Sequence, residues 1–327
     1  MASFKLYDYN SFASKRPACK AVIAYIGSNC SAFLEEINSL FFTEKFNFIL
    51  INCSEQEALS LVSICRENKI PCINYFEHSI INSKTFLPKS SYSAALLSMG
   101  SENNDVLDHI LKDKNATEFS HLAYQSYLYK HQKLSKLQDK YFEQMRLGEI
   151  RDDILQTESL LRNKDYFFIN LDSLRYSDYP YSLQSNPNGL YAEEICHIAR
   201  YIGLSLGDKQ IFIYNSLSQT SNICNICTKL IVQIIWHICS GIIINMPEFP
   251  CEENLGEIFN KKIVKMGNSQ QEINFITSTL TGRWWICIPL NQSSNYKLVP
   301  CSFSDYKCAC TGEIPLRWLF FYQKYNQ

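Results

Sequence analysis

The chain has 327 residues, and its 31 Lys and Arg residues are balanced by 32 Asp and Glu residues. The formal net charge of -1 excludes a strongly basic surface of the kind that captures nucleic acid or anionic lipid. Hydrophobic residues make up 46% of the chain and charged residues 19%, which is typical of a protein with a large buried core. This length is compatible with one large α/β domain or with two smaller domains.

Glycine and cysteine usage narrow the protein classes further. Only 11 residues are Gly, and neither G-x-G-x-x-G nor G-x-x-x-x-G-K-[ST] occurs, so a Gly-rich phosphate cradle is not expected. Many of the 14 cysteines lie in apolar runs, as Cys72, Cys196 and Cys239 do, where they are typical of small buried side chains. The first residues, Met1–Lys5, lack the apolar core of a signal peptide. We therefore predict a cytoplasmic protein with free thiols.

Apolar segments typical of strands alternate with helical patterns along most of the chain. The predicted strands are 21–26, 46–51, 72–76, 94–99, 119–124, 165–171 and 210–214. The predicted helices are 31–42, 55–68, 105–112, 130–147, 153–162, 191–202 and 224–244. Strands that alternate with helices in this way indicate βαβ units and a mostly parallel sheet.

The C-terminal part has a different pattern. Three strand-like segments, 258–265, 273–277 and 283–289, follow one another without helices between them, and the aromatic tail 314–325 is predicted to dock as a helix. We predict a single α/β domain over residues 1–327, with a strand-rich addition at about 255–327.

One apolar segment, Leu230–Met246, is barely long enough to be considered as a membrane span. It carries Gln233 and His237 near its middle, which favours the buried core helix of a large α/β protein. We therefore predict no membrane partner.

Polar residues follow two of the predicted strands, at the carboxyl ends where the functional residues of parallel sheets gather. After the strand 72–76 comes His78, which is a candidate metal ligand or general base; a histidine held in a loop by hydrogen bonds is the alternative. The strand 165–171 brings Asn170 and Asp172 to one side, because residues two apart on a strand face the same way. Two oxygen-bearing side chains suit a divalent cation, and an Asx turn is the alternative.

A turn at Asn186–Leu190 precedes the helix 191–202. We expect Gly189 to supply a positive φ in this turn. Glu193 and Glu194 then fall in the first helical turn, where the helix dipole favours negative charge.

Four cysteines raise the question of a structural zinc site. They form one C-x-x-C pair, Cys224 and Cys227, and one C-x-C pair, Cys308 and Cys310. About eighty residues separate the pairs and the first lies at the start of an apolar helix, so the spacing argues against zinc.

Four segments carry a recognisable order of motifs. The strand that ends Asn170-Leu171-Asp172 is similar to S-F-D-x-D, and Asn186–Leu190 is similar to a P-x-G-L turn that leads into an acidic helix. Gln210–Ser216 is similar to a strand that ends E-V-N-P, and Tyr75–Ser79 falls where G-G-D-H-S is expected. In this order the motifs resemble the arginase, agmatinase and formiminoglutamase family.

Further segments are similar to a bacterial, formiminoglutamase-like subgroup of that family. They are Tyr124–Tyr127, Arg146–Arg151, Arg283–Trp285, Leu298–Cys301 and Gly312–Pro315. The resemblance covers nearly the whole chain and implies a three-layer α/β/α sandwich around a mostly parallel sheet.

The resemblance also implies a site, from which this chain departs. The family's enzymes hydrolyse amidine or guanidine C–N bonds with two manganese ions, held by one His of G-G-D-H, three residues of D-A-H-x-D and two Asp of D-x-D. Here His78 and Asp172 match ligands, Asn170 replaces the first Asp of D-x-D, and Ile213 replaces the acid of E-V-N-P. No counterpart of D-A-H-x-D follows the strand 94–99.

Two ligands cannot hold two dications that repel each other a few ångströms apart. We therefore predict a degenerate manganese site in which His78 and Asp172 are vestigial ligands, with no catalytic residue and no cofactor. The protein would be a binding or regulatory homologue, with a small guanidino or amidino ligand and a homo-oligomeric state implied by the resemblance. One alternative is a formiminoglutamase-like hydrolase whose rebuilt manganese site adds Asp178 and Glu77. The other is a non-enzymatic assembly subunit.

Overall fold

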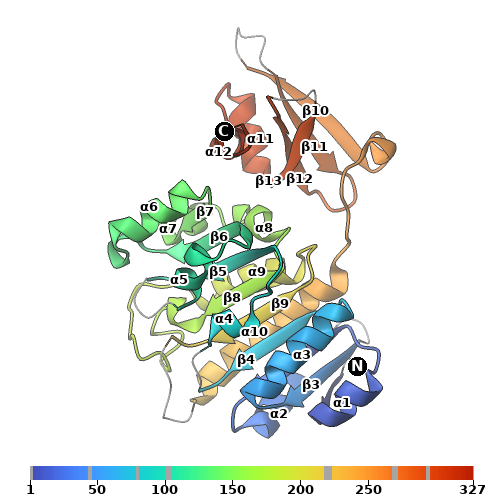
Figure 1. Ribbon diagram of the computed structural model, residues 1–327, viewed down its shortest axis with the longest axis vertical. Coiled ribbons are helices and arrows are strands. Elements are labelled where there is room, and N and C mark those ends of the chain that lie inside the picture. Colours follow the sequence, from blue (N-terminus) through green and yellow to red (C-terminus); the bar gives the residue numbers. More distant parts are fainter. Residues whose placement is uncertain are drawn as a thin grey trace. The chain divides into compact units, whose positions relative to one another are not determined.

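The computed structural model describes residues 3–42, 46–78, 81–100, 105–216, 223–266, 272–291 and 295–326. The chain divides into two compact units (Figure 1). The first comprises Met1–Ile154 and Asn163–Asn245, and the second comprises Leu155–Arg162 and Met246–Gln327. The second unit thus takes up a short internal segment as well as the C-terminal part. The single domain over 1–327 stays a prediction, because compact units can belong to one folding domain.

The first unit is built on a parallel sheet. Among the described residues its strand order is β1-β3-β2-β4-β9-β8-β5-β6-β7, and all neighbouring strands run parallel. The strands are β1 (Ser3–Tyr7), β2 (Ala21–Ile26), β3 (Asn47–Asn52), β4 (Cys72–Phe76), β5 (Tyr92–Leu97), β6 (Ala116–Tyr124), β7 (Glu143–Arg146), β8 (Tyr166–Asn170) and β9 (Gln210–Tyr214). The predicted α/β class with a mostly parallel sheet is confirmed.

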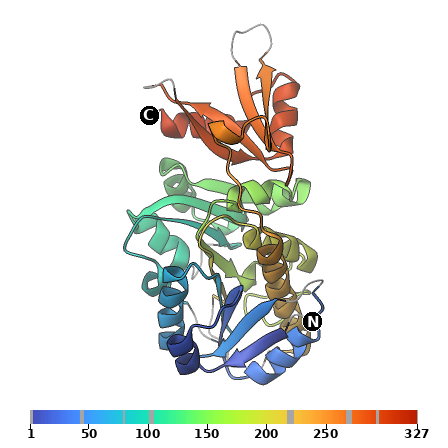
Figure 2. The same ribbon diagram turned by 90° about the vertical axis from the view of Figure 1, so that its right-hand side faces the viewer.

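Helices cover both faces of this sheet (Figures 1 and 2). On one face α10 packs against α9 and α2, and on the other α3 packs against α1 and α4, which contacts α5. The helices of this unit are α1 (Tyr9–Lys15), α2 (Cys30–Asn38), α3 (Glu55–Glu67), α4 (Ser83–Phe86), α5 (Asp105–Lys112), α6 (His131–Asp139), α7 (Leu147–Asp152), α9 (Ala192–Gly203) and α10 (Asn225–Ile244), with short 3-10 turns at Ser126–Leu128 and Leu171–Ser173.

The central strand β2 shows why the sequence folds into three layers. All six of its side chains are buried. Val22 and Ala24 join a core cluster with Leu61 of α3, whereas Tyr25 contacts Phe33 of α2 on the opposite face. Because successive side chains of a strand point to opposite faces, a strand covered on both sides must be apolar throughout. The three-layer arrangement predicted from the sequence is therefore confirmed.

The second unit contains an antiparallel sheet in the order β10-β11-β12-β13. Its elements are α8 (Gln156–Leu161), a 3-10 turn at Glu252–Asn254, β10 (Phe259–Lys265), β11 (Glu272–Ser278), β12 (Trp284–Pro289), β13 (Tyr296–Cys301), α11 (Phe303–Cys310) and α12 (Leu316–Tyr325). Phe275 and Ile286 pack with Trp318 of α12, and Phe259 and Trp285 form a second apolar cluster. The three predicted strands and the predicted tail helix are confirmed.

The predicted helix 130–147 is wrong in its second half. Helix α6 ends at Asp139, and Glu143–Arg146 forms β7, which pairs with β6. Glu, Gln, Met and Arg all favour helices, so their sequence hides a short polar strand at the edge of the sheet. The strands β1 and β13 and the helix α11 were not predicted either.

Helix α10 contains most of the segment considered as a membrane span, since it ends at Ile244. By length and hydropathy alone this helix could cross a membrane, but half of its most apolar stretch is buried inside the structure. It also packs against α9 and α2. These contacts agree with the core helix that the sequence favoured.

Candidate functional site

The candidate site lies at the carboxyl edge of the parallel sheet in the first unit. There β4 leads into Glu77 and His78, and β8 leads into Asp172. Strand β9, which leads into Ser216, lies between β4 and β8. The carboxyl ends of parallel strands meet at one edge, which is why residues nearly a hundred positions apart in the sequence gather here.

Asp172 is almost completely buried and both of its carboxylate oxygens accept hydrogen bonds from the protein. Its exposed fraction is 2%. The Ser182 hydroxyl donates to Oδ1 over 2.5 Å, and the backbone N–H of Ser216 donates to Oδ2 over 2.7 Å. The carboxylate therefore holds the loop after β8 against the end of β9.

Asn170 belongs to the same hydrogen-bond network. Its Oδ1 accepts from the backbone N–H of Asp172 at 3.0 Å, which is the Asx-type turn considered as the alternative to a cation site. Its Nδ2 donates to the Ser216 hydroxyl at 2.6 Å. The amide thus acts as donor and acceptor at once, a combination that an ionised aspartate cannot provide.

His78 contacts the same loop that binds Asp172. Its Nδ1 is 3.0 Å from the Tyr181 hydroxyl, and its Nε2 is 3.1 Å from Glu77 Oε2 and 3.2 Å from the Ser28 hydroxyl. Tyr181 is the chain neighbour of Ser182, so adjacent residues of one loop bind the two predicted ligands. The structure therefore brings His78 and Asp172 into one connected network, with the His78 side chain 31% exposed.

Glu77, the residue before His78, is a buried acid. Its Oε2 accepts a hydrogen bond from the Ser28 backbone N–H at 2.9 Å, and the residue is 1% exposed. A Cβ on Gly27 would lie 2.3 Å from that oxygen, so only glycine allows this close approach. Burial, together with the Glu77 carboxylate, raises the pKa of Tyr25 above its usual value.

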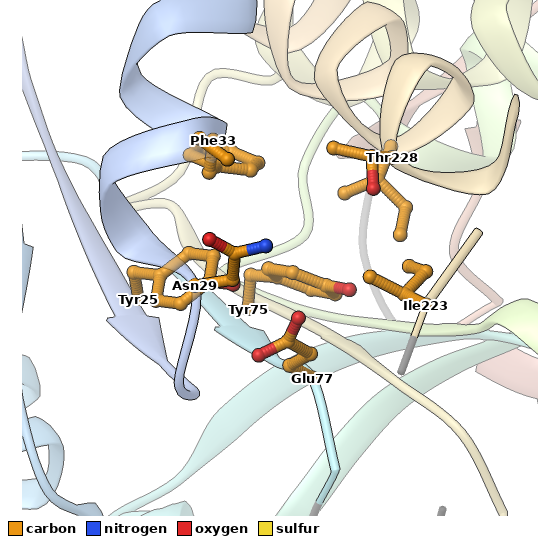
Figure 3. A pocket seen from close by; sticks show the side chains of 9 residues that line it. Tyr25, Asn29, Phe33, Tyr75, Glu77, Ile223 and Thr228 are labelled. Atoms are coloured by element: carbon orange, nitrogen blue, oxygen red, sulfur yellow. The ribbon is translucent and has the colours of Figure 1, made fainter. Parts of the chain in front are cut away.

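A small cavity of about 10 Å³ opens beside Glu77, which is room for about one water molecule. Figure 3 shows Glu77 next to the rings of Tyr25 and Tyr75, with Phe33 and Thr228 across the cavity. The Tyr75 hydroxyl is buried and has no hydrogen-bond partner in the part of the chain that the structure describes. One bound water could satisfy it, whereas a drug-sized ligand could not enter.

Two other acidic residues that the sequence singled out, Asp178 and Glu194, have structural partners. Asp178 binds the Arg175 guanidinium at 2.9 and 3.0 Å and accepts from the Ala192 backbone N–H at 2.9 Å, at the start of α9. Glu194 caps the same helix through the Tyr191 N–H and pairs with Arg151. The helix-dipole role expected for the acids of this turn therefore holds for Glu194.

The expectation for Gly189 is wrong in its reason. Its φ is not among the positive values in the described chain. A Cβ at Gly189 would instead lie 2.5 Å from the Leu174 carbonyl carbon and 2.6 Å from the Arg175 nitrogen. Close backbone packing, and not a left-handed conformation, requires glycine there.

A larger polar cavity of about 420 Å³ lies at the carboxyl ends of β6 and β7. Its lining includes two tyrosines, two arginines and two amides: Tyr124, Tyr127, Arg146, Arg151, Gln125 and Asn188. The sequence did not predict this cavity. The segments that line it are nevertheless among those that carry the family resemblance, which was the available signal.

A buried histidine behind this cavity was also missed. His121 Nε2 lies 3.1 Å from the Ser98 hydroxyl and 3.0 Å from the Tyr129 hydroxyl, and its ring stacks on Tyr124. Burial lowers the pKa of His121 to about 3. His121 is therefore neutral at physiological pH.

Metal-binding clusters are not found in the described ranges. No group of three or more His, Cys, Asp or Glu side chains there is arranged to hold an ion. Cys224 and Cys227 lie together, with Sγ atoms 3.1 Å apart, but no third ligand of these types joins them among those residues. The zinc hypothesis receives no support from this arrangement.

Comparison with known proteins identifies the fold. No family model matches the chain, and neither does any curated protein. Among solved structures, the chain is similar to an oxidised formiminoglutamase from Trypanosoma cruzi, with a TM-score of 0.57 and 15% identity over 70% of this chain and 94% of that one. It is also similar to formimidoylglutamase from Bacillus subtilis, with a TM-score of 0.54 and 12% identity over 69% and 87% of the two chains.

Arginase from Medicago truncatula is a third similar structure, with a TM-score of 0.50 and 12% identity over 72% of this chain and 91% of that one. The parallel sheet and its covering helices therefore define an α/β protein of the ureohydrolase fold. More closely, the chain has the fold of formiminoglutamase and arginase, and its sequence is divergent. The Trypanosoma cruzi formiminoglutamase has also been solved with manganese.

Proposed function

We propose that the chain is a non-hydrolytic protein of the ureohydrolase fold, in which the manganese site is degenerate and a binding or regulatory role remains. The observation that carries the proposal is the state of Asp172. Both of its oxygens accept hydrogen bonds, from Ser182 and Ser216, so one acceptor position on each oxygen already serves the protein's own network. Hydrogen bonds to charged groups are worth about 1.5–3 kcal/mol each, which manganese binding would have to replace.

The remaining donors do not compensate for this loss. Asn170 is a neutral amide whose two ends both serve the network. Glu77 is bound by the Ser28 N–H, and His78 contacts Tyr181, Ser28 and Glu77 through its two ring nitrogens. Two dications a few ångströms apart need several anionic ligands to offset their repulsion. The residues at this edge therefore do not fit a binuclear manganese centre.

The proposed ligand is a small guanidino or amidino compound, and the cavity of about 420 Å³ has the size of a small-molecule site. Its lining offers both signs of charge, since Arg146 and Arg151 lie there with Glu149 and Asp152. A planar cation with a carboxylate at its other end could find partners for both. Tyr127 would add an aromatic face for the planar group.

Metal stoichiometry and hydrolysis test the proposal together. The full chain is purified in manganese, and bound metal is measured by elemental analysis, followed by assays with formiminoglutamate, agmatine and arginine. We expect well under one equivalent of manganese per chain and no hydrolysis. The Asn170→Asp variant is the matched control, because it restores one charge but not the missing D-A-H-x-D ligands, and it should stay inactive. Two equivalents of manganese in the wild type would refute the proposal.

One observation favours the alternative, a hydrolase with a rebuilt site. His78 and Asp172 share the Tyr181–Ser182 loop, as the parts of one working site would. Asp178, however, is bound by Arg175 and by the start of α9, which removes it from the rebuilt set. Hydrolysis that Asp172→Ala abolishes, with the variant still folded, would establish this alternative.

A further inference from the structure

The two cysteines at the start of α10 are positioned as a pair. Cys224 is the N-cap residue, with an extended backbone (φ −77°, ψ 156°), and Cys227 is in the first turn of the helix. N-cap and N3 side chains face each other, which is the spacing that capping boxes use. The two Sγ atoms are 3.1 Å apart, so the thiols are in contact but not bonded. A disulfide of 2.03–2.05 Å needs a closure of about 1 Å.

The two thiols differ in their access to solvent. Cys224 is exposed, whereas Cys227 is completely buried. Cys224 caps the helix at a position open to solvent, so an external reagent can reach its sulfur. Burial raises the pKa of Cys227 to about 12, so this thiol is protonated at physiological pH. An exposed attacking thiol and a protected resolving thiol are the two parts that a dithiol–disulfide couple requires.

We propose that Cys224 and Cys227 form a redox-active dithiol, which a low-molecular-weight disulfide oxidises to an intramolecular disulfide. Cys224 as thiolate attacks one sulfur of the external disulfide, and the first external thiol leaves with the proton that Cys224 lost. Cys227 then attacks the Cys224 sulfur of the mixed disulfide, and the second external thiol leaves with the Cys227 proton. The two cysteines are oxidised, and the external disulfide is reduced to two thiols.

The cysteine pair contacts the loop that carries Tyr181, so its oxidation would change the surroundings of that loop. The Cys227 sulfur is hydrogen-bonded to the Tyr181 backbone. The Tyr181 hydroxyl in turn contacts His78. Forming the disulfide converts the thiol at this contact into a disulfide sulfur, next to the loop residues Tyr181 and Ser182 that contact His78 and Asp172. The dithiol does not depend on the proposed function of that site.

The test uses the full reduced chain and oxidised glutathione as the probe. After incubation the protein is quenched in acid, alkylated and digested, and the peptide that contains both cysteines is mapped by mass spectrometry. We expect this peptide to lose two hydrogen atoms and to resist alkylation until a reductant is added. Alkylation of Cys224 and Cys227 after treatment, or a glutathione adduct that persists on Cys224, would overturn the proposal.

Two variants provide the controls. Cys224→Ser should leave Cys227 reduced and alkylated after unfolding, because the attacking thiol is gone. Cys310→Ser removes an exposed cysteine in the second unit and should leave oxidation of the pair unchanged. Equal protection of Cys227 in Cys224→Ser and in the wild type would also contradict the proposal. The wild-type mapping needs no variant, so it decides even if a variant does not fold.

Discussion

The network around Asp172 and the cavity beside Tyr124 lie on the same edge of the sheet but use polar side chains in opposite ways. In the network, Asp172, Asn170 and Ser182 are buried and bond one another or the backbone. In the cavity, exposed side chains such as Arg146 line about 420 Å³ of open space. A buried carboxylate that bonds within the protein stabilises the fold, whereas ligand binding requires polar groups that stay accessible.

The largest expected effect comes from the buried network. Asp172→Ala removes the acceptor of two buried donors, and we expect it to lower the free energy of unfolding by about 3–5 kcal/mol in metal-free buffer. Urea denaturation measures this loss. The control Asp152→Ala, at an exposed position of the cavity, should stay within about 0.5 kcal/mol of wild type. A loss below about 1 kcal/mol for Asp172→Ala would show that the carboxylate is not structural.

The second effect concerns pH and the histidine behind the cavity. The folded pKa of His121, about 3, lies below its ordinary value of 6.5, so the unfolded chain takes up the proton first as pH falls. The stabilisation is intact above pH 6.5 and is lost progressively towards pH 3. Between pH 7.5 and pH 4.5 this residue should cost about 2–3 kcal/mol of stability.

His121→Gln tests that pH dependence. Glutamine does not titrate, and its amide can replace the contacts with Ser98 and Tyr129. Urea midpoints of the variant should fall less than those of the wild type between pH 7.5 and pH 4.5. Parallel curves for the two proteins would assign the acid sensitivity to other groups.

The third effect is the close approach of Gly27 to Glu77. Gly27→Ala places a Cβ 2.3 Å from a Glu77 oxygen and 2.7 Å from the Glu77 Cβ. We expect the free energy of unfolding to fall by about 1–2 kcal/mol in thermal or urea unfolding, because the buried Glu77 side chain or the backbone at residue 27 must shift. The matched control is Gly148→Ala, which meets no atom within 4 Å and should be neutral or slightly stabilising. Equal stability of both variants would mean that the Glu77 contact is readily relieved.

The smallest expected effect on stability concerns the polar cavity. Arg146→Ala removes an exposed ion pair with Glu149 and should change the free energy of unfolding by less than about 0.5 kcal/mol. If the cavity is a ligand site, the same variant should still weaken binding of a carboxylate-bearing guanidino compound severalfold in calorimetry. A destabilisation as large as that of Asp172→Ala would erase the distinction between the two regions.

The sequence predicted the layers of the fold because they depend on local patterns. Apolar runs marked β2, β4 and β9 at their observed bounds, since strands buried on both faces must be apolar. The edge strand β7 was not predicted, because only Met145 of its four residues is buried and the sequence Glu143–Arg146 favours a helix. An edge strand that is defined mainly by its pairing with a neighbouring strand has no continuous apolar run in its sequence.

The placement of two candidate residues follows from the same local patterns, whereas their role as metal ligands stays a prediction. His78 and Asp172 were placed at one sheet edge by the rule for parallel strands, and the structure joins them through Tyr181 and Ser182. That loop could not be predicted, because its hydrogen bonds join β4, β8 and β9 across long stretches of sequence. The close packing of Gly189 is also non-local, which is why turn chemistry suggested the wrong reason.

Manganese soaking of crystals would show whether Asp172 binds a metal ion. Data collected at the manganese absorption edge would report any ion beside Asp172 by its anomalous signal. We expect no peak there, with the Ser182 and Ser216 hydrogen bonds to the carboxylate unchanged. Two adjacent peaks within bonding distance of His78 and Asp172 would contradict it.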